Sequence, residues 1–329
     1  MGDFPGFDGL PFWINGLIVL ATFAMIGFGA HWVVEAAARI AKRFGISELV
    51  IGLTVVAFGT SAPEFAVTLI SAFEGHGDIS VGNIVGSNIF NLGFILGGCA
   101  LVRAIPISPT LLRRDGTVIG VTTILLLGLI GWDLRLDRYD GALLFFMLIA
   151  YLGYLFRQRR AGVDDEHEPD EHGVQRATSL GWDSVKLVVG LICIVGGSHF
   201  LVESATAIAR GFGVSEWVIG VTIVAAGTSA PELATSLAGV IKGRYALSAG
   251  NVIGSDIFNM LGVLGLAGML HPVDIDAMAR VSLAALCGMV FLVLFFMRTG
   301  WRVSRLEGLA LVGIAALRWG LDLSTRVSG

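Results

Sequence analysis

Long apolar runs separated by short polar connections fill nearly the whole of this 329-residue chain. A helix needs about 20 apolar residues to cross the hydrocarbon core of a bilayer, and most of the runs approach or exceed that length. The pattern predicts ten membrane spans, near residues 12–36, 48–73, 79–102, 117–132, 140–156, 183–208, 216–241, 246–270, 279–298 and 304–321. We therefore expect an all-α integral membrane protein.

The composition supports this class. The chain is 55% hydrophobic and 15% charged, whereas a soluble domain carries about 25% charged residues. The segment before the first run lacks basic residues, and that run is too long for a cleaved signal peptide, so we expect it to be retained as a span. Cys99, Cys193 and Cys287 lie in or beside apolar spans without ligand spacing, which favours a packing role.

Basic residues predict the orientation, because Lys and Arg gather on the cytoplasmic side of membrane proteins. With ten spans and both termini outside, 16 of the 22 basic residues fall on the cytoplasmic side. The remaining six are Arg135, Arg138, Arg210, Arg280, Arg318 and Arg326. We expect a multi-pass protein of a bacterial or archaeal inner membrane.

The chain contains an internal repeat. Residues 48–97 align without a gap to residues 216–265, at an offset of 168, with 26 of 50 positions identical. The repeat predicts a five-helix unit over residues 1–156, an acidic cytoplasmic linker over 157–181 and a second unit over 182–329. Because five is odd, the second unit would enter the membrane from the opposite side. Such inverted repeats are typical of transporters that work by alternating access.

A hexapeptide with unusual residues for a membrane span occurs once in each repeat. Residues 59–64 and 227–232 both read GTSAPE. A carboxylate at the bilayer centre costs at least about 2.5–3.5 kcal/mol, so it marks a site of function by default. On a helix Ala57, Thr60, Ser61 and Glu64 share one stripe, as do their counterparts in the second repeat. Pro63 removes a backbone hydrogen bond and opens that turn, which would free carbonyl oxygens.

A second polar cluster follows each hexapeptide. Residues 82–91 read GNIVGSNIFN and residues 250–259 read GNVIGSDIFN. Asn83, Ser87 and Asn91 recur every four residues and share a helix face, while the glycines allow close helix approach. These polar groups could simply join helices, but their place beside two repeated glutamates favours a site.

The donor atoms of such a site would all be oxygens, without Cys or His, which disfavours zinc and copper. Calcium takes 6–8 oxygen ligands, and two glutamates would balance its charge. Sodium accepts the same donors. Competition for shared carboxylates is a sufficient basis for exchange of the two ions.

The paired GTSAPE and GNxxGS[ND]IFN motifs resemble the α-repeats of the sodium/calcium exchanger family, over the whole chain. The resemblance implies ten helices, inverted repeats, a midplane cation site and a function as a monomer without a cofactor. It implies these ion ligands: Glu64, Glu232, Thr60, Thr228, Ser61, Ser229, Ala57, Ala225, Ser87, Ser255, Asn91 and Asn259.

One position departs from the family pattern. Some members have an aspartate where this chain has Asn259. Here an aspartate stands one helical turn earlier, at Asp256, opposite Asn88 of the first repeat. Asp256 and Asn88 are therefore further candidates, and Asp256 would lie near the site or face a neighbouring helix. The departure affects the expected stoichiometry and coupling ion.

Calcium/sodium antiport is thus the leading functional hypothesis, with the bilayer and the two ions as partners and no nucleic acid. The alternative is a cation/proton exchanger that moves calcium or another divalent ion, although such proteins resemble a different hexapeptide. An intramembrane hydrolase would need a base, but His31 and His199 lie a full span away from Ser61 and Ser229. A purely structural protein would not explain the repeated glutamates.

Overall fold

A computed structural model of the chain describes residues 7–160, 179–213, 223, 225–275 and 278–327. Most of the predicted linker and the start of the seventh predicted span lie outside the described residues. The helices are, in chain order, α1 (Phe12–Phe44), α2 (Glu48–Ile51), α3 (Ala57–Thr60), α4 (Ala62–Phe73), α5 (Gly77–Phe90), α6 (Gly97–Val102), α7 (Gly116–Asp133), α8 (Arg138–Arg160), α9 (Leu180–Gly211), α11 (Ala225–Thr228), α12 (Ala230–Ile241), α13 (Tyr245–Ile257), α14 (Leu264–Leu270), α15 (Met278–Arg298) and α16 (Arg305–Val327). Several of them are joined by π-helical turns, η2 (Gly52–Val56), η3 (Asn91–Leu96), η4 (Leu111–Asp115) and η6 (Phe258–Val263).

The all-α membrane class is confirmed. Among the described residues, seven helices are long and apolar enough to cross a membrane, and the bent pair Glu48–Thr60 and Ala62–Phe73 can form an eighth span. The described part of the seventh predicted span contains α12, a shorter apolar helix. The tenth predicted span corresponds to α16, which is not among these candidates. The count of ten spans therefore stays a prediction.

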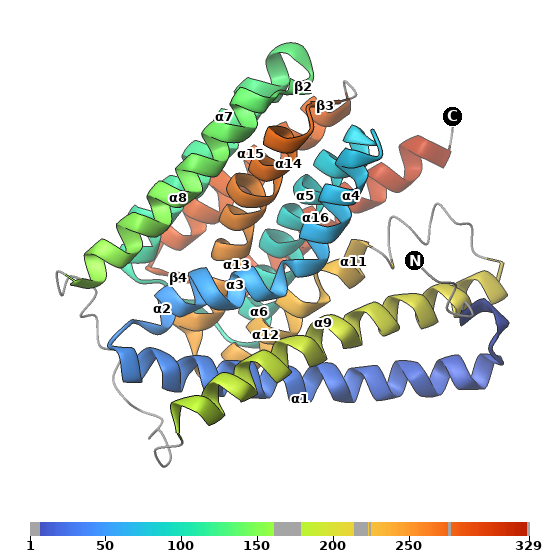
Figure 1. The fold of residues 1–329 in the computed structure, drawn as a ribbon, viewed down its shortest axis with the longest axis horizontal. Helices are drawn as coiled ribbons and strands as arrows, with labels where there is room; N and C mark the ends of the chain where they lie inside the picture. The colour runs from blue at the N-terminus through green and yellow to red at the C-terminus, as the bar shows by residue number, and fades with distance from the viewer. Residues whose placement is uncertain (1–6, 161–178, 214–222, 224, 276–277, 328–329) are drawn as a thin grey trace.

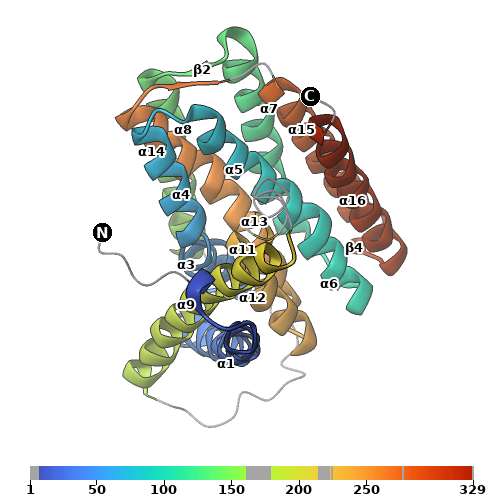
Figure 2. The ribbon, with the colours of Figure 1, turned by 90° about the vertical axis from the view of Figure 1, so that its right-hand side faces the viewer.

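Helices α1 and α9 form an antiparallel pair that crosses the remaining helices (Figure 1). Figure 2 shows α1 nearly end-on, with α9 beside it at the lower part of the molecule. The backbones approach closely at Gly29 and Gly190, where an added Cβ would lie 2.7 Å and 2.9 Å from the carbonyl oxygen of the other glycine. The pair has its own apolar cluster, which includes Val33 of α1 and Ile194 of α9.

Many of the other helix contacts join the two halves of the chain. The first half ends with α8, and the second half begins with α9. Helix α8 packs on α14, α7 on α15, and α6 on α16. At the α6–α16 contact, a Cβ added at Gly97 would lie 2.9 Å from the Gly308 carbonyl oxygen, and one added at Gly308 would lie 2.7 Å from that of Gly97. Neither half buries its helix faces alone.

Two short antiparallel strand pairs also join the halves. β1 (Ile105–Pro106) pairs with β4 (Arg302–Val303), with Ile105 opposite Val303. β2 (Arg135–Leu136) pairs with β3 (Val273–Asp274), with Leu136 opposite Val273. The two pairs lie toward opposite ends of the helix bundle (Figure 2). Each end of the bundle is therefore tied by one strand from each half.

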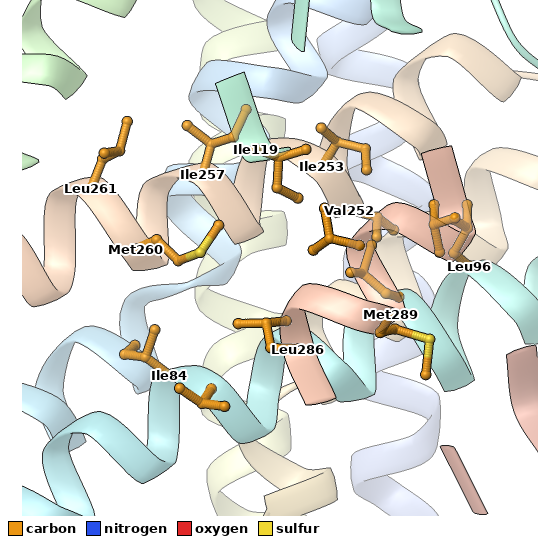
Figure 3. Packing of buried hydrophobic residues seen from close by; sticks show 14 of the residues in the cluster. Ile84, Leu96, Ile119, Val252, Ile253, Ile257, Met260, Leu261, Leu286 and Met289 are labelled. Carbon is orange, nitrogen blue, oxygen red and sulfur yellow. The ribbon is translucent and has the colours of Figure 1, made fainter. Parts of the chain in front are cut away.

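The main apolar core surrounds α5 and α13. Figure 3 shows Ile84 of α5 and Ile257 of α13 together with Ile119 of α7 and Leu286 of α15. All four side chains are at most 1% exposed. Such packing fixes the positions of α5 and α13, which carry the second polar cluster.

The segment before α3 lies directly on α13. A Cβ added at Gly254 would lie 2.6 Å from the Cα of Leu53, and one added at Gly52 would lie 2.6 Å from the carbonyl oxygen of Leu247. Only small residues allow backbones to approach this closely. These glycines bring the hexapeptide of the first half against the second polar cluster of the other half.

Candidate functional site

Each hexapeptide forms a break between two helices. Ser61 stands between α3 and α4 with φ −78° and ψ 10°, and Ser229 stands between α11 and α12 with φ −88° and ψ 7°. The proline lies in the first turn of the following helix, where its missing N–H costs little. The axis of the first pair bends by 51° at this break. The turn that the proline was predicted to open is thus a sharp kink.

The two glutamates lie in the first turns of α4 and α12, and both side chains are fully buried. Ser61 Oγ donates a hydrogen bond to Glu232 Oε1 at 2.9 Å. Ser229 Oγ donates to Glu64 Oε1 at 3.1 Å. The contact is reciprocal, as in an isologous two-fold interface, where residue i meets j and j meets i. The kink therefore points each serine at the carboxylate of the other half rather than at its own.

Each carboxylate keeps one oxygen without a partner. Glu64 Oε2 and Glu232 Oε2 are buried and make no hydrogen bond. A buried polar atom without a partner costs free energy unless a ligand or water satisfies it. Two such oxygens at the contact of the two hexapeptides are the arrangement that a cation would complete.

Hydroxyl and amide side chains extend the site on the Glu232 side. Ser255 Oγ donates to Glu232 Oε1 at 3.3 Å. Thr60 Oγ1 donates to Asn251 Oδ1 at 3.2 Å and lies 3.5 Å from Ser255 Oγ. All of these side chains are at most 1% exposed. Thr60 and Ser255, predicted from separate motifs, are therefore neighbours across the two halves.

Two asparagines hold the glutamate-bearing helices in place. Asn83 Nδ2 donates to the Glu64 carbonyl oxygen at 3.3 Å and to Thr68 Oγ1 at 3.0 Å. Asn251 Nδ2 donates to the Glu232 carbonyl oxygen at 3.4 Å and to Ser236 Oγ at 2.9 Å. The same pair of bonds thus occurs in both repeats.

Thr68 and Ser236 are site residues that were not predicted from the sequence. A signal was available, because each lies four residues after a glutamate, on the same helix face. Both hydroxyls are fully buried and receive the asparagine amide.

Asp256 belongs to a second buried group beside the glutamates. Asn91 Nδ2 donates to Asp256 Oδ1 at 2.9 Å. With its nitrogen turned toward Asp256, the Asn88 amide also donates to Oδ1, at 3.2 Å, and it lies 3.2 Å from the Asn259 amide. Asp256 Oδ2, Asn91 Oδ1 and Asn259 Oδ1 are buried and make no hydrogen bond. Asp256 thus faces the first half's asparagines.

The remaining candidates occupy the edges of this arrangement. Ser87 is 4% exposed, and its hydroxyl lies 3.5 Å from Asn259 Nδ2. The Ala57 carbonyl oxygen accepts the Ser61 N–H at 3.0 Å. Ala225 and Thr228 are the first and last residues of α11. Their role as ion ligands stays a prediction.

The chemistry of the donors is that of a hard-cation site. Across the residues that the structure describes, no three His, Cys, Asp or Glu side chains are grouped closely enough to hold a metal ion. The donors here are two carboxylates with hydroxyl and amide oxygens around them. Oxygen donors of this kind suit calcium and similar hard ions rather than zinc or copper.

We expect the two serine hydroxyls to contribute to cation affinity. Ser61→Ala and Ser229→Ala each remove a hydrogen bond to a buried carboxylate, and such bonds are worth roughly 1.5–3 kcal/mol. Each variant should lower the apparent calcium affinity about tenfold or more. Thr122→Ala is a matched control, because it removes a buried span hydroxyl that makes no hydrogen bond. Unchanged affinity in both serine variants, measured by calcium-45 flux, would contradict this role.

The similarities to known proteins extend over both halves. A family model described as sodium/calcium exchanger protein matches residues 14–157 and 184–317. The putative antiporter CaxA of Alkalimonas amylolytica is 38% identical over 308 residues, covering 90% of this chain and 94% of that protein. The sodium/calcium exchanger MaX1 of Methanosarcina acetivorans is 30% identical over 341 residues, covering 91% of this chain and 95% of that protein. A structure of the sodium-calcium exchanger NCX_Mj, soaked with Na+ and Sr2+, has a TM-score of 0.81 at 30% identity, covering 93% of this chain and 98% of that one.

Proposed function

The chain belongs to the sodium/calcium exchanger family, whose members are cation/calcium antiporters of the membrane, and we propose that it exchanges calcium for sodium. The observation that carries the proposal is the reciprocal contact of the two hexapeptides. It buries two carboxylates together and leaves one oxygen of each without a hydrogen bond.

Charge balance supports calcium as the transported divalent ion. Two buried carboxylates carry two negative charges, and leaving them unpaired in a low-dielectric site would cost several kcal/mol per charge. One calcium ion would neutralise Glu64 and Glu232 together, with hydroxyl and amide oxygens filling its larger coordination sphere. Sodium ions would neutralise the same groups one at a time. Each species therefore excludes the other from the same carboxylates, which is the basis of exchange.

We propose that transport follows an alternating-access mechanism in an architecture of ten spans and two inverted repeats. This is supported by the bonds that recur at an offset of 168, such as those of Asn83 and Asn251. The reciprocal serine–glutamate bonds have the form expected when two equivalent halves meet around a two-fold axis. A site between such halves can be exposed to either side in turn.

The proposed location is the cell membrane, with both termini outside and Lys242 and Arg244 on the cytoplasmic side. We propose that the monomer is the functional unit, because the candidate donors come from one chain. The excess of basic residues on the connections assigned to the cytoplasm supports this orientation.

The proposal is tested by calcium flux into proteoliposomes that contain the purified protein. An outward-directed sodium gradient should drive calcium-45 uptake at clamped membrane potential, and a pH gradient of equal size should not. Uptake driven by the pH gradient alone would instead support a cation/proton exchanger. Protein-free liposomes and the Glu64→Gln variant provide the background.

Asp256 is expected to influence the charge that moves in each cycle. Its carboxylate is fully buried, so its negative charge adds to those of the two glutamates and requires a further positive charge. Asp256→Asn should therefore lower the positive charge exchanged per calcium by about one. The readout is the reversal potential of calcium flux in proteoliposomes at fixed sodium and calcium gradients.

The matched control for this prediction moves the carboxylate to the adjacent turn. The double variant Asp256→Asn with Asn259→Asp keeps the number of buried acids and should restore the wild-type reversal potential. An unchanged reversal potential in Asp256→Asn would show that this carboxylate takes no part in coupling.

A further inference from the structure

A charged cluster joins α1 to α12 at one end of the α1–α9 pair. Lys242, which caps the C-terminus of α12, places Nζ 3.0 Å from Glu35 Oε1 and 3.2 Å from the His31 carbonyl oxygen. Within α1, His31 Nε2 lies 3.1 Å from Glu35 Oε1 and Arg39 Nη1 lies 3.5 Å from Glu35 Oε2, while Arg39 Nε pairs with Asp183 of α9 at 2.6 Å. The Glu35 side chain is 36% exposed and that of Lys242 is 22% exposed, so the pair is only partly shielded from water.

The rest of the contact between α1 and α12 is formed largely by small apolar side chains. Buried alanines of α1, such as Ala37 and Ala41, belong to the same apolar cluster that Ala234 and Ala238 of α12 pack against. Small side chains interlock weakly, so they resist movement of one helix along another less than large ones. Among the residues that the structure describes, the contacts of Lys242 with Glu35 and with the His31 carbonyl oxygen are the hydrogen bonds that join α1 to the end of α12.

The repeat places an opposite arrangement at the other end of the pair. At an offset of 168, the counterpart of Glu35 is Glu203 on α9, and the counterpart of Lys242 is Glu74 after α4. An acid and a base in one half thus correspond to two acids in the other. Glu203 and Glu74 are exposed, and in the described part of the chain neither side chain makes a hydrogen bond or ion pair.

The packing of the helices follows the same asymmetry. Helix α1 packs along α12, whereas the corresponding elements α9 and α4 are not packed on one another in this way. Figure 1 shows the C-terminal part of α9 running away from α4. The end that carries the ion pair is thus packed against α12, and the end that carries two acids is not packed against α4.

We propose that the Glu35–Lys242 ion pair is a latch that holds one end of the α1–α9 pair closed against α12. Because the other end has no equivalent base, the latch biases the protein toward one of the two states of alternating access. This inference rests on the proposed transport function. In the proposed orientation, the latched end is cytoplasmic, so the resting protein would be open to the outside.

The test measures access to the α1–α12 contact directly. In a variant without Cys99, Cys193 and Cys287, a single cysteine replaces Ala238, which is half-buried on α12 beside α1. Its reaction with a membrane-impermeant maleimide is followed in proteoliposomes without sodium or calcium. Lys242→Glu should increase the labelling rate about threefold to fivefold, in line with the loss of one partly exposed ion pair.

A charge-conserving variant separates a latch from general loosening. Lys242→Arg keeps a cation within reach of Glu35, beside which Arg39 and His31 stay unchanged, and should leave labelling at the original rate. Glu74→Lys places a base at the position that the repeat aligns with Lys242, so it should favour packing of α4 on α9 and raise Ala238→Cys labelling while leaving the Glu35–Lys242 pair intact. Labelling that is unchanged by Lys242→Glu, or increased equally by Lys242→Arg, would overturn the proposal.

The labelling experiment does not depend on transport. Sodium-driven calcium uptake is measured in the same proteoliposomes as a separate readout. An absence of sodium-driven uptake by the wild-type protein would count against the proposed exchange activity. The labelling rates of the single-cysteine variants alone decide whether the latch exists.

Discussion

Replacing Glu64 or Glu232 with glutamine is expected to abolish sodium-driven calcium uptake. Glutamine keeps the size of the side chain and can still accept the hydrogen bond from the facing serine, so the helices should remain in place. It removes one of the two negative charges that would balance a calcium ion. Even outer-shell changes typically cost 10–100-fold in metal affinity, so loss of a balancing charge at a proposed ligand should reduce uptake to about 1% of wild type or less.

The control for this prediction is Asp274→Asn, which removes a carboxylate that is 86% exposed in β3. It should transport calcium like wild type. Each glutamate variant is compared with it at equal amounts of reconstituted protein. Near-normal uptake in both Glu64→Gln and Glu232→Gln would reject the assignment of the site.

Adding a side chain at Gly254 is expected to lower the stability of the protein strongly. The added Cβ would lie 2.6 Å from Leu53 Cα and 2.7 Å from the Leu53 carbonyl oxygen, so the backbones themselves must separate. Overpacking of a filled core costs about 1–3 kcal/mol and sometimes more. Gly254→Ala should lower the melting temperature by roughly 2–4 °C for each kcal/mol lost, and Gly254→Leu should prevent recovery of folded protein.

Gly128 of α7 provides the comparison, because it is exposed and an added Cβ would meet nothing within 4 Å. Gly128→Ala and Gly128→Leu should both be recovered with wild-type stability. Thermal unfolding in detergent, followed by size-exclusion chromatography, measures both series. Equal melting temperatures for Gly254→Ala and Gly128→Ala would show that the α13 contact tolerates the added group.

Much of the fold and the site followed from local sequence patterns. The apolar runs predicted the helices, since a chain in a bilayer must satisfy its backbone hydrogen bonds within each segment. The GTSAPE repeat identified Glu64 and Glu232, because a carboxylate in an apolar span is costly unless it has a function. Both glutamates are buried in the structure, each in the first turn of a helix that follows a kink.

The partners of these residues could not be predicted in the same way. Helical periodicity placed Ser61 and Glu64 on one stripe, but Ser61 bonds to Glu232 of the other half. Periodicity describes which residues share a face of a helix and carries no information about which helix that face meets. For the same reason, the sequence left open whether Asp256 lies near the site, and the structure places it against Asn91.

Contacts that depend on the relative position of whole helices could not be predicted from the sequence either. Glu35 and Glu203 occupy equivalent positions in the repeat, yet Glu35 pairs with Lys242 while Glu203 has no partner among the described residues. Two identical residues thus have different surroundings, because Glu74 stands where the repeat aligns Lys242 and because α9 is not packed along α4 as α1 is along α12.

The contact of α6 with α16 affects how the protein can be made. The ribosome completes α6 long before it reaches α16, so during synthesis the glycine-lined face at Gly97 has no protein partner. Until Gly308 arrives, lipid or an insertion factor must cover that face and the edge of β1. Helix α16 therefore completes the tertiary structure of the first half, and a nascent chain that stops before it cannot bury the face at Gly97.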